Sequence, residues 1–102
     1  MHPNGKPKTY IVQLYIENPL LYNKRKFDIR CYMLLTSQNG ILKGYWYPEG
    51  YIRTSSKEFT VKNFNKMIHL TNDAVQKKGE EYGKFESGNK ISFLELQRFL
   101  DI

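Results

Sequence analysis

The chain has 102 residues, of which 40% are hydrophobic and 25% charged, and it carries a net charge of +6. This length allows one small domain, and the composition excludes both a disordered chain and a membrane span of about 18 apolar residues. A single cysteine, Cys31, excludes an internal disulfide and favours a reducing compartment. The positive charge favours an anionic partner: nucleic acid, acidic lipid, nucleotide phosphate or an acidic polypeptide.

The sequence of the N-terminal half indicates a leader, then an extended segment, then an antiparallel sheet. Residues 1–9 form a loose polar leader, which is not expected to be a signal peptide, and 9–16 predict a strand or an extended linker. A polar turn follows at 22–26, and apolar and polar side chains then alternate over 26–37, which is typical of a strand. Asn39-Gly40 predicts a tight hairpin with a return strand over 41–47. Pro48-Glu49-Gly50 predicts a further turn before a third strand over 51–55, completing a three-stranded meander.

The C-terminal half is less regular. Residues 56–90 are rich in lysine and broken by glycine, so we expect a long basic loop with one helical turn near 62–67. Ser92 and Glu95 form a capping box that predicts a short amphipathic helix up to the chain end. Cys31 alternates with apolar neighbours and is predicted to be buried. The predicted fold class is α+β: an antiparallel sheet with a long basic loop and a short C-terminal helix.

Charged side chains within strands are the unusual feature of the sequence. Lys26, Asp28 and Arg30 share one strand face, a row about 13 Å long at roughly 6.5–7 Å per two residues. Such a row suits a nucleotide, with the cations on phosphate and the carboxylate on a ribose hydroxyl or a metal, but also an exposed face with an internal ion pair. Arg53 fits a phosphate or carboxylate, or a solvated strand end. The run His69–Asn72 fits a ribose or a metal, or ordinary turn chemistry.

Four sequence motifs, which follow one another in the same order as in a known family, give this chain a family resemblance. Together they resemble the tubulin–tyrosine ligase-like family of ATP-grasp enzymes, and the likeness covers residues 10–102, as the central part of an ATP-grasp domain. The segments 73–77 and 89–92 extend the match. The four motifs are Gln13–Leu21, Arg25–Arg30, Glu49–Ser56 and His69–Asn72.

The resemblance implies an ATP-dependent ligase. A tubulin carboxylate would be phosphorylated to an acyl phosphate, and the amino group of free tyrosine, glutamate or glycine would then form an amide. The implied partners are tubulin C-terminal tails and a free amino acid, with neither nucleic acid nor membrane insertion. The implied location is the cytoplasm and cytoskeleton, including the cilium or basal body.

The resemblance also implies roles for individual residues. Two arginines would act in catalysis: Arg30 near the terminal phosphate or acyl phosphate, and Arg53 on phosphate or the incoming carboxylate. The others would bind ATP. Its adenine would lie against the hinge segment, its ribose near Lys26 and Asp28, and the run from His69 would close over the ribose. These cofactor-binding residues are Gln13, Leu14, Tyr15, Ile16, Lys26, Phe27, Asp28, His69, Leu70, Thr71 and Asn72.

Two parts of the family's ATP site have no candidates in this sequence. They are the phosphate-binding lysines upstream of the hinge and the downstream ligands of Mg²⁺, so no residue of this chain is assigned to metal. We therefore expect the chain to be the central piece of a ligase, inactive by itself. The alternative is a non-catalytic basic module that binds acidic tubulin tails.

Overall fold

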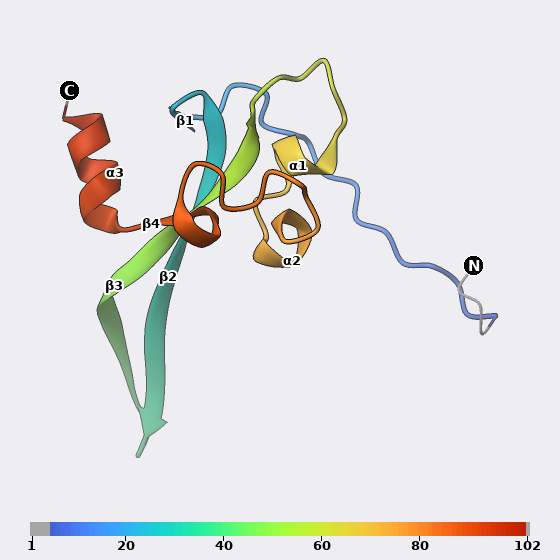
Figure 1. The fold of residues 1–102 in the computed structure, drawn as a ribbon. Helices are drawn as coiled ribbons and strands as arrows, with labels where there is room; N and C mark the ends of the chain where they lie inside the picture. The colour runs from blue at the N-terminus through green and yellow to red at the C-terminus, as the bar shows by residue number, and fades with distance from the viewer. Residues whose placement is uncertain (1–4, 102) are drawn as a thin grey trace.

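The computed structural model describes residues 5–101, which form a four-stranded antiparallel sheet and several short helices (Figure 1). The strands lie in the sheet in chain order, so the fold is α+β, as predicted. The elements are β1 (Leu21–Tyr22), β2 (Arg25–Gln38), β3 (Ile41–Glu58), α1 (Lys66–His69), α2 (Asp73–Gln76), the 3-10 helix η1 (Ser87–Asn89), β4 (Lys90–Ile91) and α3 (Phe93–Leu100).

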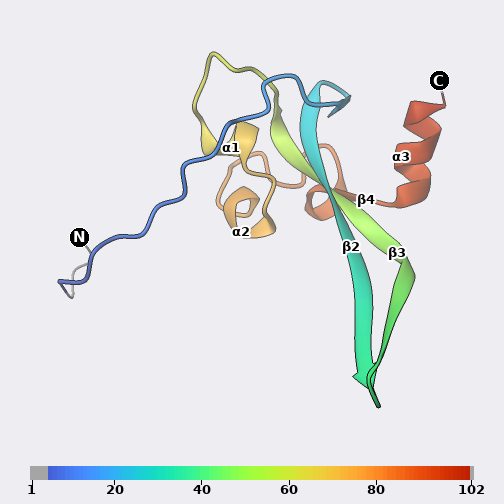
Figure 2. The same ribbon diagram turned by 180° about the vertical axis from the view of Figure 1, so that it is seen from behind.

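One long hairpin of β2 and β3 dominates the sheet. Its turn is at Asn39 and Gly40, whose φ angles of 51° and 75° are both left-handed. These two residue types accept such angles at the least cost, and the resulting turn follows the natural twist of the strands. The predicted hairpin is therefore confirmed. Its far part, residues 31–47, projects from the body of the molecule and is called the arm below (Figures 1 and 2).

The predicted turn at Pro48-Glu49-Gly50 is wrong, because β3 runs through these residues and only bends (Figure 1). Arg30 pairs with Tyr51, whereas Tyr32 pairs with Tyr47, so the register shifts between them. One residue of β2 thus lies opposite three of β3. Such a bulge tolerates a proline, which cannot donate to the ladder. The expected three-stranded meander is instead one bent hairpin.

A small core lies where β4 and α3 meet the base of the hairpin. Ile52, Ile91 and Leu96 are buried there, and a few partly buried aromatic side chains pack around them. α3 begins as predicted: the Ser92 hydroxyl accepts a hydrogen bond from the Glu95 backbone N–H at 3.1 Å. Since no layer covers the arm, Cys31 is exposed and its predicted burial is wrong.

The remaining segments differ in part from the prediction. Residues 9–16 are extended but lie outside the sheet, so the linker alternative holds. The polar turn is present at Asn23 and Lys24. α1 begins at Lys66, later than the predicted helical turn at 62–67, because Asn65 caps it by accepting from the Met67 N–H at 2.9 Å. Within residues 5–101, no helix has the length and apolarity needed to cross a membrane.

Candidate functional site

A cluster of three side chains joins segments that are far apart in the sequence. Tyr15 comes from the N-terminal linker, Lys26 from β2 and His69 from the end of α1. The Tyr15 hydroxyl lies 2.7 Å from His69 Nδ1, and Lys26 Nζ donates to that hydroxyl at 3.2 Å and to the His69 carbonyl at 2.9 Å. Lys26 Nζ also lies 4.8 Å from the centre of the Tyr15 ring. The linker is therefore fixed to the sheet at this point.

The partners of His69 define the direction of these hydrogen bonds. Its Nε2 lies 2.5 Å from the Asn63 carbonyl oxygen, which can only accept, so Nε2 carries a proton. In the neutral ring Nδ1 is then an acceptor, and the Tyr15 hydroxyl donates to it. The Tyr15 oxygen consequently accepts from Lys26. Two of the three ammonium hydrogens of Lys26 are used in this cluster, and the third remains for an anionic ligand.

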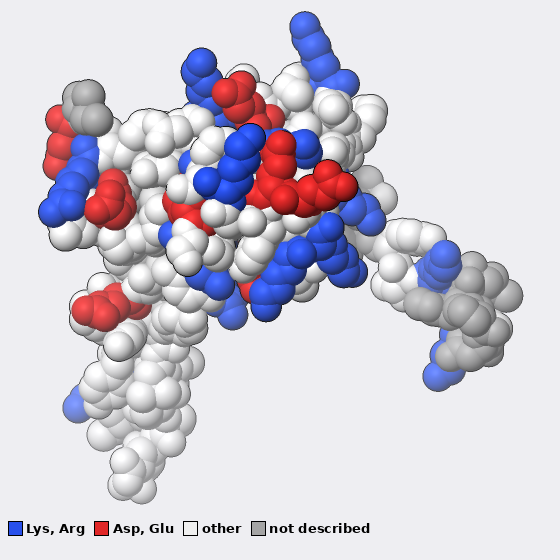
Figure 3. Space-filling model, in the orientation of Figure 1, with Lys and Arg blue, Asp and Glu red and all other residues white. Residues whose placement is uncertain are grey.

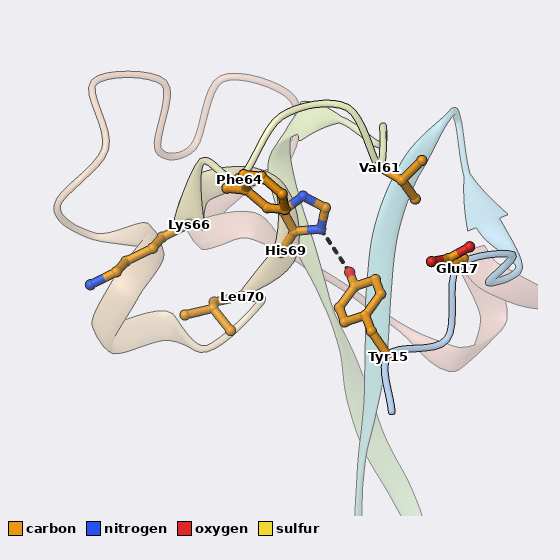
Figure 4. A pocket seen from close by; sticks show the side chains of 7 residues that line it. All are labelled: Tyr15, Glu17, Val61, Phe64, Lys66, His69 and Leu70. Carbon is orange, nitrogen blue, oxygen red and sulfur yellow. Dashed lines mark hydrogen bonds between the residues drawn. The ribbon is translucent and has the colours of Figure 1, made fainter. Parts of the chain in front are cut away.

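A hollow of about 410 Å³ opens beside this cluster (Figure 4). The linker, the segment between β3 and α1, and α1 with the residue after it all contribute to its wall. Aromatic and aliphatic side chains dominate the lining, which suits a flat heteroaromatic ring. The lining residues are Tyr15, Glu17, Val61, Phe64, Lys66, His69 and Leu70.

A second cluster is built on a cross-strand pair. Asp28 of β2 and Arg53 of β3 are directly opposite in the register. Arg53 donates from Nε at 2.7 Å and from Nη2 at 2.9 Å to the two carboxylate oxygens, and this hydrogen bonding raises the pKa of Arg53 above its ordinary value. The Thr71 hydroxyl donates to Asp28 as well. Among the described residues, Arg53 Nη1 has no hydrogen-bond partner, so it is available to an anion.

The two clusters form one continuous site. Lys26 and Asp28 are two residues apart on one face of β2, as the alternation predicted. His69 and Thr71 are two residues apart on the facing segment, which starts at the last residue of α1. Lys26 donates to the His69 carbonyl, and Asp28 accepts from the Thr71 hydroxyl. The site therefore consists of a β2 edge with two charged anchors, a facing strip at 69–71, and an aromatic hollow at one end.

Other residues predicted for the site lie apart from this cluster. Gln13, Leu14 and Ile16 are exposed along the linker, and Asn72 is exposed at the start of α2. The Phe27 side chain packs against the core. Arg30 is exposed beside the register shift, with its guanidinium carbon 5.8 Å from the centre of the Tyr32 ring. The roles assigned to these residues remain predictions.

Sequence reasoning missed the buried polar residues beneath the site. Gln76, at the end of α2, is fully buried and hydrogen-bonded to Ser56, Asn89 and two backbone carbonyls. Arg25 is buried too, and its guanidinium forms a two-point ion pair with Glu86. No periodicity marks Gln76, because helices of four residues are too short to show a pattern. The signal available for Arg25 was its place next to Lys26 in the same motif.

The hydrogen-bond donors of Lys26 and Arg53 suit the nucleotide that the family resemblance implies. Two cations with free donors beside an aromatic hollow fit a nucleotide. In contrast, residues 5–101 contain no group of three or more His, Cys, Asp or Glu side chains that could hold a metal ion.

Comparison with known proteins identifies the family. Residues 2–102 match the tubulin–tyrosine ligase family, so the chain belongs to it. It is 51% identical over 75 residues to tubulin glycylase 3B of Drosophila melanogaster, covering 74% of this chain and 10% of that protein. It is 41% identical over 103 residues to tubulin glycylase 3D of Tetrahymena thermophila, covering 96% and 10%.

A third relative carries a different activity in its name. The chain is 40% identical over 98 residues to the probable alpha-tubulin polyglutamylase Ttll1 of Tetrahymena thermophila, covering 93% of this chain and 23% of that protein. Against the two glycylases, this chain spans about a tenth of their length.

Proposed function

We propose that this chain forms the nucleotide-binding core of a ligase that uses ATP to join an amino acid to tubulin. The observation that carries the proposal is the convergence of Tyr15, Lys26 and His69 on one aromatic hollow, with Asp28 and Arg53 next to them. These residues lie in the linker, in two strands and at the end of α1. Membership of the tubulin–tyrosine ligase family supports the choice of ATP as the nucleotide and an ATP-grasp arrangement as the fold.

In this proposal the hollow takes the adenine ring. Tyr15 and His69 offer aromatic surface to the base. Backbone contacts from Gln13, Leu14 and Ile16 to the edge of the base are assigned from the family resemblance, because these residues do not line the hollow. Phe27 supports the strand from the core side, since its side chain packs there. The third hydrogen of Lys26 and the Asp28 carboxylate face the ribose. The strip from Leu70 to Asn72 closes over the sugar.

The arginines serve the phosphates and the reaction. Arg53 Nη1 binds a phosphate oxygen or the carboxylate of the incoming amino acid, while Asp28 holds the guanidinium in place. Arg30 is exposed at the far end of the row and meets the terminal phosphate. A tubulin carboxylate attacks the γ-phosphorus and displaces ADP. The amine then attacks the acyl phosphate carbon, loses a proton and releases phosphate, leaving an amide. No step is assigned to Mg²⁺.

The names of the relatives support glycine or glutamate as the amino acid and tubulin as the acceptor. Tubulin C-terminal tails are acidic, and the charge of +6 on this chain favours such a partner. A cytoskeletal location, including the cilium, follows from that acceptor.

Calorimetric titration of the 102-residue chain with ATP tests the proposal. We expect binding, and at least about tenfold weaker binding in Asp28→Ala and Arg30→Ala, which corresponds to ~1.4 kcal/mol each. The matched control is Lys43→Ala, which removes an exposed cation in the arm and should leave the affinity unchanged. Absence of binding, or an equal loss in the control, would reject the proposal for this chain.

The second candidate is a non-catalytic basic module for acidic tubulin tails. It is favoured by the lysines gathered on the face around α2 in Figure 3, several of which are exposed in the lysine-rich segment 57–90. This candidate predicts binding of a polyglutamate peptide that weakens steeply with added salt and does not respond to ATP. Competition between ATP and the peptide would instead favour the ligase.

A further inference from the structure

We infer that Gln76 is a positioning residue that sets the strip His69–Thr71 against β2 and thereby controls nucleotide affinity without touching the nucleotide. This inference rests on the proposed function. It comes from a buried side chain that none of the proposed chemistry uses.

The amide of Gln76 is fully buried and fully hydrogen-bonded. Its Oε1 accepts from the Ser56 N–H at 3.1 Å, from the Ser56 hydroxyl at 2.6 Å and from Asn89 Nδ2 at 3.3 Å. Its Nε2 donates to the carbonyls of Met67 at 3.2 Å and Leu70 at 2.6 Å. The orientation of the amide is fixed by these partners, because a backbone N–H only donates and a carbonyl only accepts.

This arrangement makes Gln76 a bridge between the sheet and the strip. Its oxygen is attached to β3 through Ser56, and its nitrogen holds the backbone on both sides of the α1 C-terminus. Leu70 is extended, with φ −107° and ψ 103°. In extended backbone, successive peptide groups face opposite sides. The Leu70 carbonyl therefore faces Gln76, while the His69 carbonyl and the Thr71 hydroxyl reach β2.

Each of the three consecutive residues of the strip is thus held by a side chain from a neighbouring element. His69 is bound by Lys26, Leu70 by Gln76 and Thr71 by Asp28. The first and third anchors are ligand-facing side chains, which a bound nucleotide would engage. Gln76 is the anchor on the opposite side of the strip and is inaccessible to any ligand, since it is 0% exposed. It can affect binding only through the position of the strip.

Replacement of Gln76 by glutamate separates positioning from packing. The shape is kept, but a carboxylate has no hydrogen to donate to Met67 and Leu70 and would face two carbonyl oxygens. Protonation at acid pH restores one donor. We therefore expect the ATP affinity of Gln76→Glu, taken as a ratio to wild type at each pH, to be at least about tenfold lower at pH 8 and to recover toward pH 5.

Two further variants serve as controls. Ser56→Ala removes one hydroxyl partner of the Gln76 oxygen but leaves both donors to the strip, so its ATP affinity should stay within about twofold of wild type. Gln38→Glu makes the same chemical change at the exposed tip of the arm and should show no pH-dependent ratio. Circular dichroism establishes that each variant is folded.

Hydrogen exchange of the Leu70 amide supplies a readout that does not involve nucleotide. In the free chain this N–H donates to the Lys66 carbonyl at 2.9 Å. We expect faster exchange there in Gln76→Glu at pH 8 and wild-type exchange in Ser56→Ala. If wild type fails to bind ATP while this difference is present, the proposed function fails and Gln76 still positions the strip. Equal exchange in all variants, or an equal affinity loss in Ser56→Ala, would overturn the inference.

Discussion

Asp28 and Arg53 stand directly opposite each other on β2 and β3 and are joined by two hydrogen bonds of 2.7 and 2.9 Å. Their side chains are only 32% and 19% exposed, respectively, so solvent screens the pair weakly. Asp28 belongs to the row of charges predicted on β2, and Arg53 faces it from β3. The pair fixes one wall of the candidate site before any ligand is present.

Asp28→Asn should therefore destabilise the fold by about 1–2 kcal/mol, because it removes one partner of a partly buried charge pair. Urea unfolding measures the loss. Arg53→Lys should show a similar loss, since an ammonium cannot make the two-point contact. An unfolding midpoint in Arg53→Lys equal to that of wild type would show that the geometry of the pair contributes nothing.

Tyr15→Phe should release the N-terminal linker while leaving the aromatic ring in place. The hydroxyl that links Lys26 to His69 is lost, and with it about 0.5–1 kcal/mol of local stability. We expect faster chymotrypsin cleavage within residues 5–20. The matched control is Tyr45→Phe in the arm, for which cleavage of the linker should not change. Equal cleavage rates in the two variants and wild type would refute this role of Tyr15.

Asp73 predicts a dependence of stability on acid pH. Hydrogen bonds from Lys77 and Tyr82 lower the pKa of Asp73 below its ordinary value of 3.8. The ionised carboxylate therefore stabilises the fold above pH 3.8, and this contribution is lost as the pH falls through the lowered pKa. The urea midpoint of Asp73→Asn should lie below that of wild type at pH 6 and approach it below pH 3.8. A difference in urea midpoint between Asp73→Asn and wild type that stays constant from pH 6 to pH 3 would contradict this prediction. The control is Glu49→Gln, which makes the equivalent change at an exposed carboxylate.

The arm should make the free chain self-associate. Figure 3 shows it nearly without charge, and Lys43 is its only charged residue. Long exposed apolar strands with unpaired edges tend to pair with other chains. Trp46→Lys and Leu34→Lys should each shift sedimentation velocity profiles toward monomer, whereas exposed Leu94→Lys on α3 should not. A wild-type chain that is monomeric at high concentration would contradict this expectation. The large hydrophobic residues of the arm that are more than half exposed are Met33, Leu34, Leu35, Ile41, Leu42, Trp46 and Tyr47.

The sequence predicted the local features of the fold well. Alternation placed Lys26 and Asp28 on one face, Asn39-Gly40 predicted the hairpin turn, and Ser92 predicted the start of α3. Each of these depends on a few neighbouring residues. Pro48 to Gly50 was misread because proline and glycine mark a bulge as well as a turn, and only pairing across the sheet separates the two.

The candidate site could be predicted only as a set of residues. The sequence named Tyr15, Lys26 and His69, but their contact depends on how the linker crosses the end of α1. The partner of Asp28 depends on strand register, which the bulge sets. Gln76 was missed because a buried glutamine is recognised by its partners, which lie 6 to 20 residues away in the chain. Cys31 was predicted to be buried because it alternates with apolar neighbours, but alternation does not reveal whether another layer covers that face of the strand. No layer covers the arm, so Cys31 is exposed.

The most direct test of the account is residue-resolved NMR of the ¹⁵N-labelled chain titrated with ATP. We expect amide shifts concentrated at Tyr15, at Lys26 to Asp28 and at the strip His69–Thr71, with the arm around Trp46 unaffected. Shifts confined to residues 77–90, or no shifts at saturating ATP, would contradict the assignment of a nucleotide site to this cluster.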